Sequence, residues 1–208
     1  RVKEDIMSDK RYQEEYLRRI HKVQDYIEQH TGNLKLMEVV KVKKVLLVID
    51  MQNVCVGEKH AAYFKYDNEI LIQAVNKVIE ANKDNPVIYI KNIMKKNLIN
   101  KFAPFQAYEG TEEVELVSGL HIVSDYIFTK YEGNAFSNSK LNEFLKEHLV
   151  ECVEVVGVDG GGCVALTALG AIKEGYSVIV NEKAIGTMFD KNKEKYFKKL
   201  READVKFI

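Results

Sequence analysis

Short apolar runs alternate with amphipathic segments along most of this 208-residue chain, and this alternation constrains its fold more than any other feature. Residues 45–49, Val-Leu-Leu-Val-Ile, are apolar at every position, which is typical of a strand buried on both faces of a sheet. Residues 68–82 carry apolar side chains at helical spacing, and so do residues 139–148. Strands that alternate with helices predict a parallel sheet with helices on both faces.

We therefore expect a three-layer α/β/α fold around a mostly parallel sheet of about six strands. The expected strands lie at 45–49, 86–90, 126–129, 153–158, 176–180 and 205–208. No linker rich in Ser, Gly or Pro divides the chain, so residues 43–208 are expected to form one domain. Residues 1–42 form an N-terminal extension whose apolar side chains recur as in an amphipathic helix, at Tyr16, Leu17, Ile20, Val23 and Ile27.

Charge and cysteine content exclude several classes of function. The chain has 31 basic and 31 acidic side chains, and this neutral balance argues against an electrostatic nucleic-acid binder. No apolar run approaches the roughly 18 residues that span a bilayer, and no segment has the pattern of a secretion signal. Three scattered cysteines form no disulfide framework. We expect a cytoplasmic protein with neither a nucleic-acid nor a membrane partner.

Three chemically useful side chains follow the ends of three expected strands. Asp50 ends the first, Lys130 ends the third, and Cys163 begins a helix after the fourth. Ligands of an open parallel sheet bind beyond the carboxyl ends of its strands, so all three would face one crevice. Singly, each has an ordinary explanation as a turn former, a solvated charge or a packed thiol. Their coincidence at one edge of the sheet points to a site.

A carboxylate, an ammonium and a thiol together could form a cysteine nucleophile. Helix N-terminal amides and nearby cations lower the pKa of a thiol, Asp50 could accept its proton, and Lys130 would hold Asp50 anionic. The glycines at 160–162 would let backbone N–H groups approach an oxyanion. A dinucleotide fingerprint is the competing explanation of these glycines. However, their spacing does not match Gly-x-Gly-x-x-Gly, and they follow the fourth strand instead of the first.

Three stretches that contain these side chains resemble motifs of the isochorismatase-like cysteine hydrolases, a family that includes nicotinamidases and N-carbamoylsarcosine amidases. Residues 46–53 resemble the opening strand with its aspartate. Residues 128–136 resemble the lysine motif, and residues 156–164 the nucleophile segment. The resemblance covers roughly residues 43–190, with the motifs in the family's order and spacing.

The resemblance implies a catalytic triad of Asp50, Lys130 and Cys163, with an oxyanion hole from the backbone N–H groups of Asp159 and Cys163. It also implies a cis peptide bond directly before Asp159. From the same motifs we expect Gln52 and Phe136 to bind substrate. The weakly patterned residues 95–121 are long for a connection and are a candidate substrate lid.

Departures from the family pattern narrow the expected reaction. Metal-dependent nicotinamidases have Asp-x-His where this chain has Lys-Asn-Ile-Met at 91–94, and none of its five histidines falls at a ligand spacing. We therefore expect no metal and no cofactor. Asp159 replaces a residue that is commonly small and neutral, which changes the expected charge of the pocket. Isochorismatases that cleave a vinyl ether generally lack the cysteine, so Cys163 favours an amide.

The expected function is metal-independent cysteine hydrolysis of a C–N bond in a small amide or ureido substrate, through a thioester intermediate. Two alternatives stay open: vinyl-ether hydrolysis of the isochorismatase type, and a non-catalytic assembly protein on the same fold. Family members commonly form homo-oligomers, so the resemblance also implies a dimer or a larger assembly. We expect the N-terminal helix to contribute to its interface.

Overall fold

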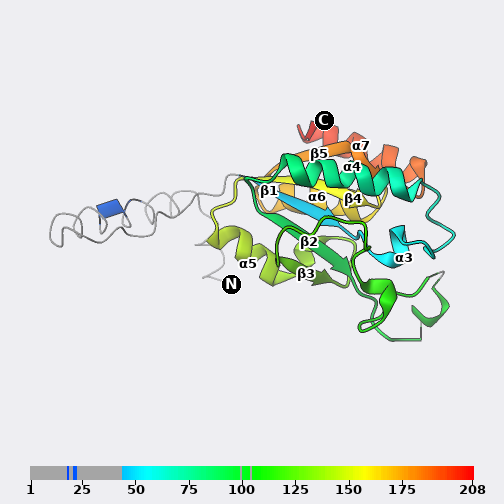
Figure 1. Cartoon of the computed structure of the whole chain (residues 1–208). Coiled ribbons are helices and arrows are strands. Elements are labelled where there is room, and N and C mark those ends of the chain that lie inside the picture. The colour runs from blue at the N-terminus through cyan, green and yellow to red at the C-terminus, as the bar shows by residue number, and fades with distance from the viewer. Residues whose placement is uncertain (1–17, 19–20, 23–43, 99, 104) are drawn as a thin grey trace. The chain divides into compact units, whose positions relative to one another are not determined.

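The computed structural model describes residues 18, 21–22, 44–98, 100–103 and 105–208 (Figure 1). The chain divides into two compact units, residues 1–40 and 41–208, and the description below concerns the second. Apart from residues 18, 21 and 22, the expected N-terminal helix lies outside the described residues, and so does the expected domain boundary at 42/43. No helix in the described part of the chain is long and apolar enough to cross a membrane.

Six parallel strands form one sheet in the order β3-β2-β1-β4-β5-β6, which confirms the predicted parallel α/β fold. The first strand, β1, lies in the middle of the sheet. The next two strands follow on one side of it, and the last three on the other side. The strands are β1 (Lys44–Ile49), β2 (Val87–Asn92), β3 (Ile127–Lys130), β4 (Cys152–Val158), β5 (Ser177–Gly186) and β6 (Lys206–Phe207). The order reverses between β1 and β4, where a ligand site is expected in such a sheet.

Helices cover both faces of this sheet (Figure 1). On β1, Val45, Leu47 and Ile49 pack into one apolar core, and Leu46 and Val48 into the other, because alternate side chains of a strand point to opposite faces. The helices are α3 (Asn53–Val56), α4 (Asn68–Ala81), α5 (Ser139–Glu147), α6 (Cys163–Lys173) and α7 (Asp190–Glu202). Three 3₁₀ turns lie at Asn100–Phe102, Glu112–Val114 and Ala135–Ser137. Helices α3 and α4 pack on the second core, and α5, α6 and α7 on the first.

Strand β5 is longer than the sequence pattern predicts. Its first half matches the expected strand at 176–180, but it continues to Gly186 through the polar residues 181–183. The continuation pairs with the end of β4 after an irregularity in register, with Gly157 opposite Ile185 and Val158 opposite Gly186. The extra length is fixed by pairing with a neighbouring strand and not by an apolar run. It brings the chain after β5 beside the helix start that carries Cys163.

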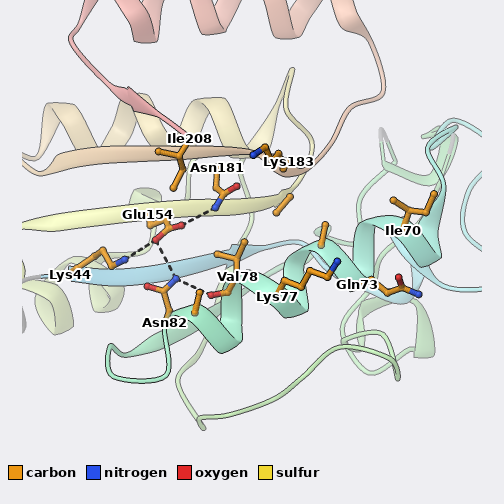
Figure 2. A pocket seen from close by; sticks show the side chains of 13 residues that line it. Lys44, Ile70, Gln73, Lys77, Val78, Asn82, Glu154, Asn181, Lys183 and Ile208 are labelled. Carbon is orange, nitrogen blue, oxygen red and sulfur yellow. Dashed lines mark hydrogen bonds and ion pairs between the residues drawn. The ribbon is translucent and has the colours of Figure 1, made fainter.

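One carboxylate is buried within the apolar layer between the sheet and α4. Glu154 on β4 is 3% exposed, and its Oε2 accepts hydrogen bonds from Lys44 Nζ at 3.0 Å and Asn82 Nδ2 at 3.2 Å (Figure 2). Its Oε1 accepts a third from Asn181 Nδ2 at 3.2 Å. Three donors satisfy the buried charge, as such a group requires. These residues line a hollow of about 570 Å³ that shares no lining residue with the cavity described below.

Gly157, near the end of β4, lies directly against the backbone of Ile49 on β1. Its φ is +108°, and a Cβ there would collide with the carbonyl oxygen of Ile49. Gly175 has a similar φ of +91°, but a Cβ there would meet nothing within 4 Å. We expect Gly157→Ala to lower the free energy of unfolding by about 4 kcal/mol or more, and Gly175→Ala by only about 1–2 kcal/mol of backbone strain.

Urea unfolding of the two variants measures this difference. Equal losses in both variants would show that the close approach of β4 to β1 does not matter for stability.

Candidate active site

The three side chains predicted from the strand ends meet in the structure. Asp50 follows β1 directly, Lys130 is the last residue of β3, and Cys163 is the first residue of α6. Lys130 Nζ lies 2.8 Å from Asp50 Oδ2 and 3.2 Å from Cys163 Sγ. Since β2 separates β1 from β3, the lysine reaches across the end of β2, where Asn92 Oδ1 lies 3.3 Å from the same nitrogen.

The Lys130 ammonium is 99% buried and fully partnered. The residue is 1% exposed, and a protonated amine has three hydrogens to donate. Three acceptors surround it: the Asp50 carboxylate, the Asn92 amide oxygen and the Cys163 sulfur. Burial alone would lower its pKa, but the charges and hydrogen bonds of Asp50 and Cys163 raise the pKa of Lys130 above its ordinary value. The lysine is therefore a permanent cation at this site.

The thiol of Cys163 is protonated at neutral pH. Burial, followed by the negative charge of Asp50, raises the pKa of Cys163 to about 12, and the opposing effect of Lys130 is smaller. The lowering of the thiol pKa expected from the lysine is therefore present but is outweighed by burial and by the charge of Asp50. The second oxygen of Asp50, Oδ1, is buried and has no hydrogen-bond partner among the described residues. It is a free acceptor beside a thiol that still holds its proton.

Asp159 fixes the turn between β4 and α6 through both its backbone and its side chain. Its carbonyl oxygen accepts hydrogen bonds from the amides of Gly162 and Val164, each at 3.0 Å. Its Oδ1 accepts from the amide of Gly161 at 3.1 Å and from that of Met188 at 2.8 Å. The peptide bond before Asp159 is cis, as the family resemblance implies. The turn is thus tied to the segment that follows β5.

The glycines of this turn have a packing explanation. A Cβ on Gly161 would lie 2.8 Å from Asn192 Cβ and 2.9 Å from the backbone nitrogen of Lys193, at the start of α7. A side chain at Gly161 would push the turn between β4 and α6 away from α7. The run of glycines is consistent with close approach of these two segments and needs no nucleotide to account for it.

A cavity of about 130 Å³ opens at these groups. Its lining residues with polar side chains are Asp50, Gln52, Asn92, Asp159 and Cys163, and Gly162 also lines it. Most of its wall is apolar, from Val54, Cys55, Phe64, Phe105, Ala107, Val158 and Met188. Two of these residues, Phe105 and Ala107, belong to the stretch 95–121, so the segment predicted as a lid does line the cavity.

Gln52 lines the cavity, but its polar atoms are used by the backbone. Its Nε2 donates to the carbonyl oxygens of Asn92 at 3.1 Å and Val114 at 2.9 Å, and its Oε1 accepts from the amide of Asn92 at 2.7 Å. The Gln52 side chain is fully buried. It therefore joins the ends of β1 and β2 to the lid segment, and this accounts for all of its hydrogen-bonding groups but one lone pair.

Phe136, the other residue expected to bind substrate, does not line the cavity. Its ring packs against Tyr176, with the ring centroids 5.7 Å apart, at the edge of the core beneath α5 and α6. Three cavity residues were missed from the sequence: Asn92, Phe64 and Met188. The rule that strand ends carry ligand contacts could have found Asn92, which ends β2. The other two lie in connections, and no local pattern distinguishes them.

No metal site is present among the described residues. They contain no group of three His, Cys, Asp or Glu side chains placed to hold a metal ion. Metal-dependent nicotinamidases have their Asp-x-His motif at the position where β2 ends in this chain. The residues there are Asn92, with its amide side chain, and then Ile93 and Met94. This donor set does not suit zinc or iron, which take imidazole, thiolate and carboxylate ligands.

Comparisons with known proteins show the family to which the chain belongs. The isochorismatase domain model matches residues 44–207. The uncharacterized isochorismatase family protein YaaI of Bacillus subtilis (strain 168) is 26% identical over 182 residues, which are 74% of this chain and 86% of that protein. Among solved structures, an isochorismatase-like hydrolase from Alkaliphilus metalliredigens has a TM-score of 0.68 and 27% identity, and covers 79% of this chain and 93% of its own.

Other similar structures are amidases by name. The N-carbamoylsarcosine amidase of Thermoplasma acidophilum has a TM-score of 0.67 and 24% identity, and covers 79% of this chain and 95% of its own. Pyrazinamidases and nicotinamidases share the same fold. Because the family model spans nearly all of the second unit, the chain belongs to the isochorismatase family of hydrolases.

Proposed function

We propose that this chain hydrolyses the C–N bond of a small amide or ureido compound through a thioester on Cys163. One observation carries the proposal: the Lys130 ammonium lies between the Asp50 carboxylate and the Cys163 sulfur, and both of these groups belong to residues that line the cavity. A nucleophile, a base and a fixed cation within hydrogen-bond reach of one another are the parts that covalent catalysis needs. The small cavity suits a compact substrate.

In the first step, Cys163 Sγ attacks the carbonyl carbon of the substrate while its proton passes to Asp50. The free, buried Oδ1 of Asp50 is the acceptor for that proton. Lys130 does not take part in the transfer, because its three hydrogens are already donated. It stabilises the carboxylate before the transfer and the sulfur during the attack. The S–H bond and the π bond of the carbonyl group break in this step, and the C–S bond and a new O–H bond on Asp50 form.

The carbonyl oxygen becomes an oxyanion during this attack. We assign its stabilisation to the backbone N–H groups of Asp159 and Cys163. Around the start of α6, the amides of Gly162 and Val164 donate to the carbonyl oxygen of Asp159. Among the described residues no hydrogen bond is found from the amides of Asp159 or Cys163. These two N–H groups are therefore available to the oxyanion.

Collapse of the tetrahedral intermediate breaks the C–N bond. The leaving nitrogen takes the proton from Asp50 and departs as ammonia or an amine, and the acyl group stays on Cys163 as a thioester. Water then attacks the thioester and gives a proton to Asp50. The sulfur leaves and recovers that proton, which restores the thiol.

The same fold could instead cleave a vinyl ether or act without catalysis. A thiol at the start of α6, in contact with Lys130 and its partner Asp50, has no role in either alternative, and this favours the amide reaction. Ammonia release separates amide cleavage from vinyl-ether cleavage, which releases none.

Cys163→Ala should abolish ammonia release from any small amide that the wild-type protein hydrolyses. To test this, both proteins are incubated with a panel of carboxamides and ureido compounds, and the ammonia released from each compound is measured. Cys152→Ala is the matched control, because Cys152 begins β4 at the opposite end of that strand and touches no part of the cavity. A loss of activity in Cys152→Ala alone, or full activity in Cys163→Ala, would place the nucleophile elsewhere.

Asp50→Asn should lower the pKa of the Cys163 thiol and still reduce activity. The negative charge of Asp50 raises that pKa, so its removal lets the thiolate form at lower pH. The rate should nevertheless fall by about 10²–10⁴-fold, because the proton acceptor is lost. Thiolate absorbance against pH, with Cys163→Ala to identify the signal, measures the first effect, and steady-state kinetics measures the second.

Circular dichroism should accompany this variant, since Lys130 loses its charged partner. A raised thiol pKa in a folded Asp50→Asn protein would contradict the proposed arrangement.

Chelation should leave activity unchanged, since the described residues offer no set of metal ligands at the site. Dialysis against a chelator, followed by the ammonia assay, tests this expectation. If activity disappeared and zinc or iron restored it, ligands outside the residues considered would have to be sought.

A further inference from the structure

We infer that the Asp159 carboxylate sets the substrate charge: the cavity favours amides that carry a cationic amine and disfavours amides that carry a carboxylate. The inference rests on the proposed amide hydrolysis and deepens it by naming a substrate class. Asp159 is one of the residues that line the cavity, and the role inferred here for its carboxylate is separate from the backbone role already proposed for it.

Asp159 is the one charge at this cavity that no cation balances within the described part of the chain. The other carboxylate there, Asp50, is paired with Lys130 at 2.8 Å. Burial raises the pKa values of Cys55 and Cys163, so both thiols are neutral. None of the ion pairs found among the described residues includes Asp159. The cavity and its lysine therefore carry one negative charge in excess.

The only ammonium in contact with the cavity residues is unavailable to a substrate anion in the described structure. Lys130 donates to Asp50, Asn92 and Cys163, which uses all of its hydrogens. A substrate carboxylate would have to displace one of these partners and would still face Asp159. Like charges repel strongly in a site with apolar walls. This repulsion between Asp159 and a substrate carboxylate disfavours anionic amides relative to neutral and cationic ones.

One oxygen of Asp159 is left for a ligand. The amides of Gly161 and Met188 both donate to Oδ1 and hold the carboxylate in place. Among the described residues no hydrogen bond is found to Oδ2, and a Cβ built on Gly162 would lie 3.0 Å from it. Oδ2 thus lies beside the residue that directly precedes the Cys163 nucleophile. A donor or a cation on the substrate can meet it there while the scissile carbonyl faces the sulfur.

The test uses three series of primary amides of matched chain length: ω-amino amides, unsubstituted alkanamides and ω-carboxy amides. The wild-type protein should show the highest kcat/KM for the cationic series and the lowest for the anionic series. Asp159→Asn keeps an oxygen to accept from Gly161 and Met188 but removes the charge. In this variant the cationic-to-anionic ratio of kcat/KM should fall by about tenfold to a hundredfold, as expected for one charge a few ångströms away.

Binding to the Cys163→Ala protein, measured by calorimetry with the same amides, separates this inference from the proposed function. If Cys163→Ala still hydrolyses amides, or no amide is hydrolysed at all, the proposed function fails, and the calorimetric order still tests the charge preference. If amides are hydrolysed through Cys163 but Asp159→Asn leaves the ratio unchanged, the inference alone is overturned. An anionic preference in the wild-type protein would overturn it as well, whether or not the variant folds.

Discussion

The buried pair of Lys130 and Asp50 is the interaction on which the rest of the site depends. An ammonium removed from water is unfavourable by several kcal/mol unless a counter-charge and hydrogen-bond acceptors replace the lost hydration. Here the acceptors come from β2, from the end of β1 and from the start of α6. The lysine is accommodated only where these three segments meet. The strand order β3-β2-β1-β4 brings them to one edge, so the same arrangement satisfies the charge and assembles the chemistry.

The polar groups of the site divide into those that hold its shape and those left free to react. Gln52 and Asp159 Oδ1 are occupied by backbone amides and carbonyls, which fix the lid segment and the nucleophile turn. Among the described residues Asp50 Oδ1 has no hydrogen-bond partner, and the hydrogen bond found at the Cys163 sulfur comes from Lys130 and not from the backbone. Gln52 and Asp159 Oδ1 already have backbone hydrogen-bond partners. They therefore do not compete for hydrogen bonds with Asp50 Oδ1 and the Cys163 thiol, which can lie close together.

The sequence was sufficient for the sheet and for the meeting of Asp50, Lys130 and Cys163 at one edge of it, because both follow from local patterns. Apolar runs marked the buried strands, and the residues directly after them marked the site. Properties that arise between distant segments could not be read in this way. Phe136 lies in a motif beside Lys130, yet its ring packs on Tyr176 in the core. The second half of β5 is polar and becomes a strand only through its pairing with β4.

The protonation state of Cys163 was also beyond the sequence, because it depends on how deeply the thiol is buried and how near Asp50 lies. Because burial and the charge of Asp50 raise the pKa of Cys163 to about 12, the proposed reaction starts from the neutral thiol and not from a preformed thiolate. The proton has to leave as the bond to carbon forms, and Asp50 is placed to receive it. A thiol kept neutral in this way resists alkylation and oxidation until a carbonyl group occupies the cavity. The carboxylate that raises the thiol pKa is then also the base that removes its proton. In the proposed mechanism the thiol is thus neutral at rest and gives its proton to Asp50 only as it attacks a bound substrate.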